Sequence, residues 1–579
     1  MRPDVADFYD GLLFDAYRLL GAHPAGPGRG WLFTVWAPHA RRVQVLGDWN
    51  GWDLYHAAEL AFCEDGLWRG RVPEARSGQL YKYNLQGPDG RWHLRPDPYA
   101  FDAEPLPGTA SRLFRPQADF TAPARRGVGP DDPIRIYEMH ATSWRRHWDG
   151  RYYTGSELAR DLVPYLQAHA FTHVELMPLA EYPFDGSWGY QGCGYFCPTR
   201  RLGGFAGLTA LVEALHRAGI GVLMDFVPVH FAADEGRLAR FDGAPLYESG
   251  PSDWGSLNFD LSCGPVRSFL LSSAAFWLQV CGCDGLRVDA IGNALYHCGN
   301  GWQAAEFFKT LTAGLHARFP GVMLVAEDTA GAMNATATTR DGGLGFDYVW
   351  DIGWTRGTLA YLAAPFDRRP QMFDRWLSVL EMPPHTRGMN ALSHDDNAPG
   401  TGAIYEQLFG SEEQKLAQLR LLLLLQAARP GKTLLFSGTE FAQPHAFHPG
   451  REPDWAAAAA APRRDLDAFC AALNRFAGDH PALFCGEYRP GALCRAGQDA
   501  GCGVFGFVRR GEGETLLCAF NTGAGTVSGF SFVVGGSGQA LPRFAAGPLG
   551  DAPVPVREGR VRLDLPGLSG GIWEIRGTP

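Results

Sequence analysis

Four carboxylates each stand at the end of a different apolar run of this 579-residue chain. They are Asp225 in VLMDFVPVH, Asp289 in GLRVDA, Glu327 in VMLVAED and Asp395 in NALSHDD. Continuous apolar runs are typical of strands buried on both faces, where an ionised carboxylate is costly. One such acid usually caps a strand or forms a salt bridge. Four acids at matching positions indicate a shared site.

Cationic and imidazole side chains occur in the same runs. Arg287 lies two residues before Asp289, so the alternation of a strand points both side chains to one side. His230 and His394 close two of the runs. We therefore expect a pocket that contains the acids, one arginine and two histidines.

Glycosidic bond chemistry fits this set of side chains. It needs one carboxylate as nucleophile and a second as general acid and then general base. Retaining enzymes hold these two groups about 5–5.5 Å apart, a separation that adjacent strands can supply. Aromatic rings stack on sugar faces, and the segment SWGYQ offers Trp188 and Tyr190 for this role. Ordinary loop packing is the alternative interpretation of both rings.

The elements that must position these residues are eight strand-like runs between about 133 and 475. The runs are PIRIYEMH, THVELMPL, GVLMDFVPVH, CDGLRVDA, GVMLVAED, a weaker DYVWDIGW, GMNALSHDD and KTLLFSGTE. Amphipathic segments separate them, among them Ser156–Ala168, Leu208–Ala218, Arg267–Val280 and Glu412–Ala428. Alternating strands and helices predict a parallel sheet, and eight units favour a (β/α)8 TIM barrel. All strand carboxyl ends of such a barrel open onto one face, which carries the active site.

Short alternating strands flank this region on both sides. WLFTVWAP, RRVQVLGDW, LWRGRVP and QLYKYNLQ precede it, and VFGFVRR, TLLCAFN, VSGFSFVV, RVRLDLP and GIWEIR follow it. A Pro- and Arg-rich stretch, Arg115–Pro133, separates the first group from the barrel. We predict an α/β fold with three domains: an N-terminal β-sandwich (1–115), a catalytic barrel (116–480) and a C-terminal β-sandwich (481–579).

Composition argues against several functional classes. The net charge is −10 and no long Lys/Arg run occurs, so binding to nucleic acid or to an anionic membrane is not expected. The longest apolar run, Leu421–Leu425, is far shorter than the roughly 20 residues of a membrane span, and we find no export signal. Twelve cysteines without a CxxC pair favour reduced thiols. We expect a cytoplasmic monomer that needs no metal and no cofactor.

Taken together, the motifs resemble the α-amylase superfamily and, within it, the 1,4-α-glucan (glycogen) branching enzymes. DFVPVHF, GLRVDA, VAEDT and LSHDD stand in the order of the four signature regions. MPLAEYPFDGSWGYQ, LYHCGNGWQAAEFF, GGLGFDYVWDIGW and KTLLFSGTEFAQ look like branching-enzyme segments between them. FDAYRLLGAHP and FTVWAPHARRVQVLGDWNGWD resemble the glucan-binding sandwich that precedes this barrel. The likeness covers nearly the whole chain.

The resemblance implies a role for each candidate residue. Asp289 is expected to be the nucleophile, Glu327 the general acid/base, and Asp395 the carboxylate that orients substrate hydroxyls and stabilises the transition state. The glucosyl unit that becomes covalently attached is expected to be lined by Tyr190, Asp225, His230, Arg287 and His394. Arg287 would hold Asp289 ionised. The expected partner is an α-glucan such as glycogen, amylose or amylopectin.

Two segments depart from the pattern of that family. After LSHDD the family usually continues with Glu and then His-Gly-Lys, whereas here Asp396 is followed by NAPGTGAIYEQLFG. The stretch between Asp289 and Glu327 is also shorter than is usual in that family. Both changes fall at the predicted barrel mouth, so an amylase-like hydrolase or a 4-α-glucanotransferase with the same three acids remains an alternative. A non-catalytic glucan-binding protein is a third alternative, which the presence of all three acids disfavours.

Overall fold

The computed structural model describes residues 5–63, 66–116, 129–298, 301–331, 334–381 and 386–578. The chain forms two compact units, and both draw on segments far apart in the sequence. The first comprises Met1–Arg126, His140–Asp161 and Glu175–Phe346, and the second comprises Gly127–Met139, Leu162–Val174 and Asp347–Pro579. Most of the predicted linker, residues 117–128, lies outside the described residues. The predicted three-domain limits remain a prediction.

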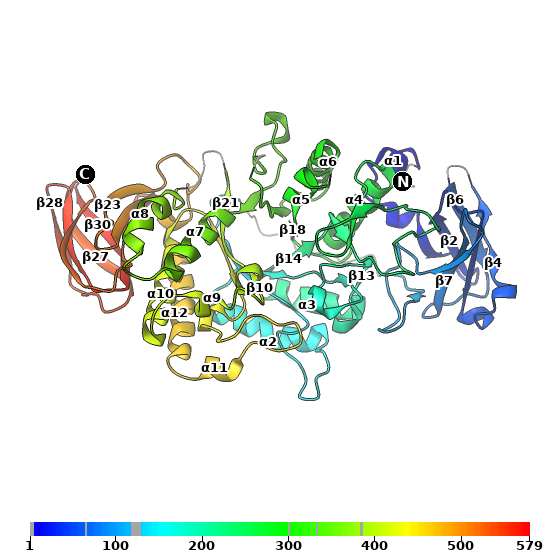
Figure 1. The fold of residues 1–579 in the computed structure, drawn as a ribbon, viewed down its shortest axis with the longest axis horizontal. Helices are drawn as coiled ribbons and strands as arrows, with labels where there is room; N and C mark the ends of the chain where they lie inside the picture. The colour runs from blue at the N-terminus through cyan, green and yellow to red at the C-terminus, as the bar shows by residue number, and fades with distance from the viewer. Residues whose placement is uncertain are drawn as a thin grey trace. The chain divides into compact units, whose positions relative to one another are not determined.

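Eight strands close into a barrel in the order β10-β11-β14-β18-β19-β20-β21-β22. Figure 1 labels β10, β14, β18 and β21. The bounds of the eight strands are Arg135–Met139, His173–Leu176, Gly221–Phe226, Gly285–Val288, Met323–Ala326, Tyr348–Trp350, Gly388–Leu392 and Lys432–Phe436. Each lies inside one of the eight predicted runs, so the predicted (β/α)8 barrel is confirmed. Most of these strand residues are buried, as the continuous apolar runs indicate.

Four helices lie over the predicted amphipathic segments: α2 Gly155–Ala168, α3 Gly204–Arg217, α4 Gly264–Gln279 and α10 Glu412–Ala428. The other helices of the described residues are α1 Val5–Asp10, α5 Ile291–Tyr296, α6 Gly301–Arg318, α7 Ile352–Ala363, α8 Arg369–Ser378, α9 Ile404–Gln407, α11 Trp455–Ala459 and α12 Arg463–Asp479. Helix α10 has the predicted bounds because Ser411 and Gln414 form a capping box at its start. Its Leu421–Leu425 run is buried.

The weakest predicted strand, DYVWDIGW, is only partly a strand. β20 ends at Trp350, and the Asp351 side chain then accepts a hydrogen bond of 3.0 Å from Trp354 N at the start of α7. An aspartate in this position satisfies a free N–H group of the first helical turn. The rest of the run is therefore helical.

The N-terminal region is a pair of antiparallel sheets. One contains β1 Gly21–Pro24, β2 Trp31–Trp36, β6 Leu67–Val72 and β5 Ala61–Phe62; the other contains β4 Ala58–Glu59, β3 Arg42–Gly47, β7 Leu80–Gln86 and β8 Trp92–Arg95, with β9 Ser111–Arg112 paired to β7. Phe33 of β2 meets Tyr81 and Tyr83 of β7 edge to face, so the two sheets share a core. The predicted N-terminal sandwich is confirmed.

The C-terminal region is one antiparallel sheet of eight strands. In spatial order these are β23 Cys494–Asp499, β24 Val504–Gly511, β25 Glu514–Asn521, β30 Ser569–Thr578, β27 Ser537–Ala546, β28 Val554–Arg557, β29 Arg560–Leu565 and β26 Val527–Val533. Ala496 of β23 and Phe532 of β26 belong to one buried cluster, so the sheet curves around its own core. Sequence alternation does not reveal β27 because Pro542 interrupts it, and a register shift follows that proline.

Two small sheets lie in the connections that leave the barrel strands. β12 Ala180–Glu181 pairs with β13 Gly194–Pro198, and β15 His230–Phe231 pairs with β17 Leu257–Phe259, which also pairs with β16 Glu248–Pro251.

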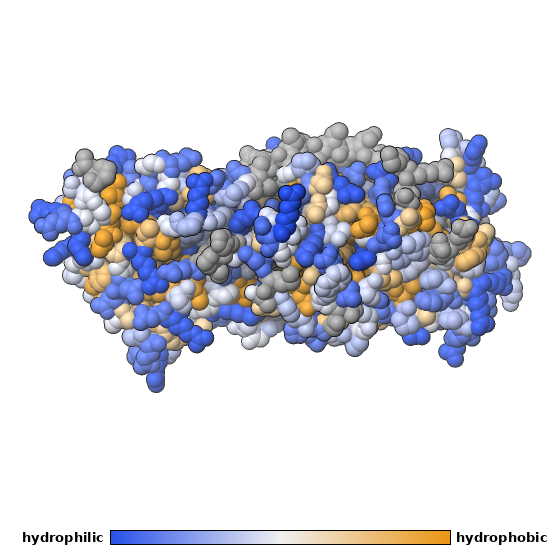
Figure 2. All heavy atoms as spheres, turned by 90° about the horizontal axis from the view of Figure 1, so that it is seen from above, coloured by the Kyte–Doolittle hydropathy of each residue, from blue (hydrophilic) through white to orange (hydrophobic). Residues whose placement is uncertain are grey.

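Among the described residues no helix is long and apolar enough to cross a membrane. On the face drawn in Figure 2, hydrophilic side chains break up the apolar areas.

Candidate active site

Strand register brings two candidate acids of the first unit to one level. Val288, the last residue of β18, pairs in parallel register with Ala326, the last residue of β19, and Asp289 and Glu327 directly follow them. The backbone continues this pattern: Glu327 N donates to Val288 O at 3.0 Å. The two acids that end successive strands are therefore neighbours at the carboxyl edge of the sheet.

One guanidinium connects the acids of this unit. Nη1 of Arg287 donates to Oδ1 of Asp289 at 2.9 Å, to Oδ2 of Asp225 at 3.2 Å and to the Tyr190 hydroxyl at 3.2 Å. Nη2 lies 3.4 Å from Oε2 of Glu327. All of these residues except Tyr190 are buried, and Arg287 is only 1% exposed. Asp225, Asp289 and Glu327 therefore share one cation, the guanidinium of Arg287.

The charge of Arg287 is maintained by its neighbours. Burial lowers the pKa of this guanidinium, but Asp225, Tyr190, Asp289 and Glu327 outweigh burial and raise the pKa well above its ordinary value. Arginine also offers a planar fork that can serve several carboxylates at once. The site therefore keeps a fixed positive charge beside both candidate catalytic acids.

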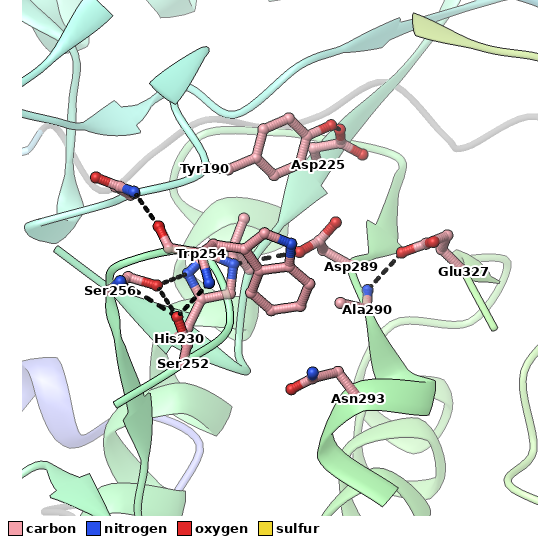
Figure 3. Close-up of polar contacts among 12 residues, drawn as sticks. Tyr190, Asp225, His230, Ser252, Trp254, Ser256, Asp289, Ala290, Asn293 and Glu327 are labelled. Carbon is pink, nitrogen blue, oxygen red and sulfur yellow. Dashed lines mark hydrogen bonds and ion pairs between the residues drawn. The ribbon is translucent and has the colours of Figure 1, made fainter. Parts of the chain in front are cut away.

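Tyr190 reaches this cluster from the loop after β12. Its hydroxyl donates to Oδ2 of Asp225 (Figure 3). The preceding Gly189 has φ +96°, and a Cβ there would lie 2.5 Å from Pro178 O, so only glycine fits this turn. Trp188 ends the turn Asp185–Ser187 (η5) with φ 57° and is half-buried. The structure thus places Trp188 in the Tyr190 loop.

Glu327 is oriented by the residue that follows the candidate nucleophile. Oε2 of Glu327 accepts a hydrogen bond of 2.7 Å from Ala290 N. Ala290 has φ 50°, an uncommon conformation for a residue with a side chain, and it begins helix α5. This turn directs the Ala290 N–H towards Glu327, so Asp289 and Glu327 are positioned by a single piece of backbone.

His230 stands on the other side of Asp289. Its Nε2 lies 3.9 Å from Oδ2 of Asp289, and its ring packs against Trp254 with 4.8 Å between centroids. Burial lowers the pKa of His230 to about 4. The imidazole is therefore neutral at the pH of most cells.

The second unit carries the third candidate acid in a different setting. Glu138, at the end of β10, is fully buried; its Oε2 accepts from His394 N at 2.9 Å, and its Oε1 lies 2.5 Å from His394 Nδ1. His394 Nε2 is 3.4 Å from Oδ1 of Asp395, whose side chain is 59% exposed. Glu138 therefore orients His394, which in turn contacts Asp395.

Asp396, the last residue of the LSHDD motif, caps the turn that presents Asp395. This turn, η8, spans His394–Asn397, and Oδ2 of Asp396 accepts hydrogen bonds from Ser393 N at 2.9 Å and Ser393 Oγ at 3.3 Å. Burial, together with the negative charges of Asp395 and Glu138, outweighs these hydrogen bonds and raises the pKa of Asp396 to about 7.

The structure therefore brings most candidate residues into two groups. The first unit brings together Tyr190, Asp225, His230, Arg287, Asp289 and Glu327. The second unit brings together His394 and Asp395. Glu138 was not among the predicted site residues, although its position inside the apolar run PIRIYEMH is a signal that could have identified it.

Exposed aromatic rings of the barrel region share one kind of location. Among the described residues from β10 to α10, six large aromatic side chains are exposed: Trp148, Phe184, Trp254, Tyr296, Trp302 and Phe409. Each follows the carboxyl end of a barrel strand, in the connecting segment or the start of the next long helix. Exposed rings on this side of a barrel are suited to stacking against sugars.

Comparison with known proteins gives a consistent result. Residues 19–100 match carbohydrate-binding module 48 (isoamylase N-terminal domain). The structure resembles the pullulanase of Anoxybacillus sp. LM18-11 solved with maltotetraose, with a TM-score of 0.77 and 16% identity over 98% of this chain and 89% of that one. It also resembles the pullulanase of Paenibacillus barengoltzii, with a TM-score of 0.76 and 17% identity over 98% of this chain and 97% of that one. These likenesses establish the fold.

Sequence identity to proteins named as 1,4-alpha-glucan branching enzymes is much higher than to these two pullulanases. The chain is 39% identical to the 1,4-alpha-glucan branching enzyme GlgB of Bacillus caldolyticus over 89% of this chain and 80% of that protein. It is also 39% identical to the enzyme of the same name from Dechloromonas aromatica (strain RCB), over 82% of this chain and 81% of that protein. The chain therefore belongs to the family of 1,4-α-glucan branching enzymes.

Proposed function

We propose that this protein is a retaining 1,4-α-glucan branching enzyme that transfers a glucan chain through a covalent intermediate on Asp289. The observation that carries the proposal is the placement of Asp289 and Glu327 on one guanidinium at the ends of successive barrel strands. A retaining mechanism needs two such carboxyl groups close together.

The first half of the reaction breaks an α-1,4 link. Oδ of Asp289 attacks the anomeric carbon, the bond from that carbon to the bridging oxygen breaks, and protonated Glu327 gives its proton to the departing 4-oxygen. The products are a glycosyl ester on Asp289, a free chain end and an ionised Glu327. Arg287 favours ionised Asp289 beforehand, since its Nη1 donates to that carboxylate.

The second half makes the new link. The ionised Glu327 takes the proton of an acceptor 6-hydroxyl, whose oxygen attacks the anomeric carbon and displaces Asp289. Two inversions leave an α-1,6 link. Asp395 is proposed to bind sugar hydroxyls and stabilise the positively charged transition state, and its high exposure leaves the carboxylate accessible to a ligand. Tyr190, Asp225, His230, Arg287 and His394, with Trp188 nearby, are proposed to bind the donor glucosyl unit.

An α-glucan such as glycogen or amylose is the proposed substrate. The module matched by residues 19–100 is named as carbohydrate-binding, and the relatives are named for activity on 1,4-α-glucan. The exposed rings on the carboxyl side of the barrel would supply stacking surfaces along a chain. We further propose a monomer that acts in glycogen synthesis in the cytoplasm, where its twelve free cysteines would stay reduced.

The product of the reaction with amylose tests this proposal. A branching enzyme lowers iodine staining and creates α-1,6 links, which NMR detects, without a matching rise in reducing ends. A rise in reducing ends without new branches would reject the proposal in favour of a hydrolase.

A second candidate function has its own supporting observation. The segment after Asp396, NAPGTGAIYEQLFG, departs from the family pattern, and the Asp396 carboxylate that precedes it is bound to Ser393. A changed acceptor region would favour hydrolysis or 4-α-glucanotransferase activity by the same three acids. Redistribution of linear chain lengths would identify the transferase. Glucan binding without any turnover would identify a non-catalytic binding protein.

A further inference from the structure

The turn between β16 and β17 contacts the active-site histidine. It runs from Ser252 to Ser256 and places two serine hydroxyls and one tryptophan ring beside His230 (Figure 3). Ser256 Oγ lies 3.0 Å from His230 Nδ1, and Ser252 Oγ lies 2.5 Å from Ser256 Oγ. The three side chains form a continuous hydrogen-bonded chain that ends on the imidazole.

The direction of this chain follows from the groups that surround Ser252. Ser252 Oγ accepts from Trp254 N and from Ser256 N, each at 3.2 Å, so both of its lone pairs are used. Its own hydrogen must then point to Ser256 Oγ. The hydrogen of Ser256 is left to donate to His230 Nδ1, and Nδ1 is therefore an acceptor.

A neutral imidazole that accepts at Nδ1 carries its proton on Nε2. His230 Nε2 lies 3.9 Å from Oδ2 of Asp289, which is too long for a hydrogen bond. The Nε2–H group is thus a donor that faces the candidate nucleophile without binding it. A sugar hydroxyl placed near both groups could accept from Nε2–H and donate to the carboxylate.

Other contacts hold the turn in place. Trp254 packs on the His230 ring, and its carbonyl accepts from Gln191 Nε2 at 3.1 Å. Asn293 Nδ2 of helix α5 donates to Asp253 Oδ2 at 3.4 Å, which ties the turn to the segment that follows Asp289. The low pKa of His230, caused by burial, agrees with a ring that stays neutral.

We propose that Ser256, oriented by Ser252, is a positioning residue that fixes the His230 ring with Nε2–H aimed at a hydroxyl of the bound glucosyl unit. The inference rests on the proposed function, because it assigns a role within the same glucosyl subsite. Among the described contacts of this turn, Ser256 Oγ is the group that can donate to His230 Nδ1.

Kinetics of single and double variants test this role. Ser256→Ala should lower kcat on amylose about tenfold, as expected for a lost hydrogen bond, while Ser256→Thr, which keeps the hydroxyl, should retain most activity. In a His230→Gln background, Ser256→Ala should lower kcat less than about twofold, because the imidazole that Ser256 positions is gone.

Ser249→Ala is the matched control: Ser249 lies on the same hairpin and contacts only backbone oxygens of Asn258 and Phe259 in the described contacts. Its activity should be unchanged. Full activity of Ser256→Ala, or an equal loss in both backgrounds, would overturn the proposal.

A spectroscopic measurement does not depend on turnover. In protein labelled with 15N-histidine, the His230 resonances, assigned with His230→Gln, should show an unprotonated Nδ1 and a protonated Nε2. A proton on Nδ1 in the wild-type protein would overturn the inference even if the protein branches glucan. If the protein shows no action on amylose, the proposed function fails, and the nitrogen resonances still decide whether the serine chain sets the state of the ring.

Discussion

Two acid-bearing regions of the molecule present their carboxylates in opposite ways. The side chains of Asp289 and Glu327 are 10% and 9% exposed and share the guanidinium of Arg287, whereas the Asp395 side chain is 59% exposed and contacts only an imidazole that Glu138 orients in the described contacts. A buried carboxylate needs a paired cation, because an unpaired buried charge is costly. An exposed carboxylate keeps its charge through water. The first region therefore depends on its cation, and the second depends on the turn that presents it.

The largest expected effect is the loss of the proposed nucleophile, Asp289. Asp289→Asn preserves shape but removes the attacking oxygen charge, so kcat on amylose should fall about 10⁴-fold. Asp328→Asn is a matched control, because Asp328 also follows β19 but only caps Ala330 N and Gly331 N in the described contacts. This control should remain close to wild type. Near-normal activity of Asp289→Asn would mean that Asp289, like Asp328, is not a catalytic acid.

The next effect tests the shared cation. Arg287→Lys keeps a positive charge but loses the fork that reaches Asp289, Asp225 and Glu327 together, so kcat should fall about 10²–10³-fold. The measurement is the initial rate of branching with amylose, at equal folded fraction judged by circular dichroism. A lysine variant with wild-type kcat would mean that only net charge matters in this region.

A smaller effect is expected in the second region. Glu138→Gln keeps one acceptor for His394 but removes the charge, so the orientation of His394 beside Asp395 should weaken and kcat should fall about tenfold. Steady-state kinetics should show the change. A loss as large as that of Asp289→Asn would contradict the view that the second region tolerates weaker pairing.

The smallest expected effect concerns stability and pH. The pKa of Asp396 is raised from 3.8 in the unfolded chain to about 7 in the folded protein, so its stabilising contribution is present below pH 4 and is lost as the pH rises through 7. Asp396→Asn can still accept from Ser393 and has no charge to bury. The variant should gain about 1–2 kcal/mol over wild type at pH 8, because partial exposure reduces the full effect of the shift.

Thermal unfolding midpoints of both proteins at pH 5 and pH 8 measure this gain. The difference between variant and wild type should grow towards pH 8. An equal difference at both values would show that the Asp396 carboxyl does not titrate in this range.

Much of the fold could be predicted from local patterns. The eight apolar runs contain the barrel strands, and the predicted amphipathic segment Glu412–Ala428 coincides with α10, because burial on both faces and amphipathic periodicity depend on neighbouring residues. Three strands of the C-terminal sheet were missed: β23, β27 and β28. Of these, β27 contains Pro542 and lacks clear alternation. The four acids could also be predicted, since each stands at the end of an apolar run.

The amino-acid sequence by itself determined which side chains end the barrel strands, and therefore which acids could meet at the carboxyl edge. Only the tertiary structure decided the parallel register that levels Asp289 with Glu327, the left-handed turn at Ala290, and the contact of Ser256 with His230, 26 positions apart. Register and hydrogen-bond direction depend on the packing of segments distant in the chain. No local periodicity carries that information.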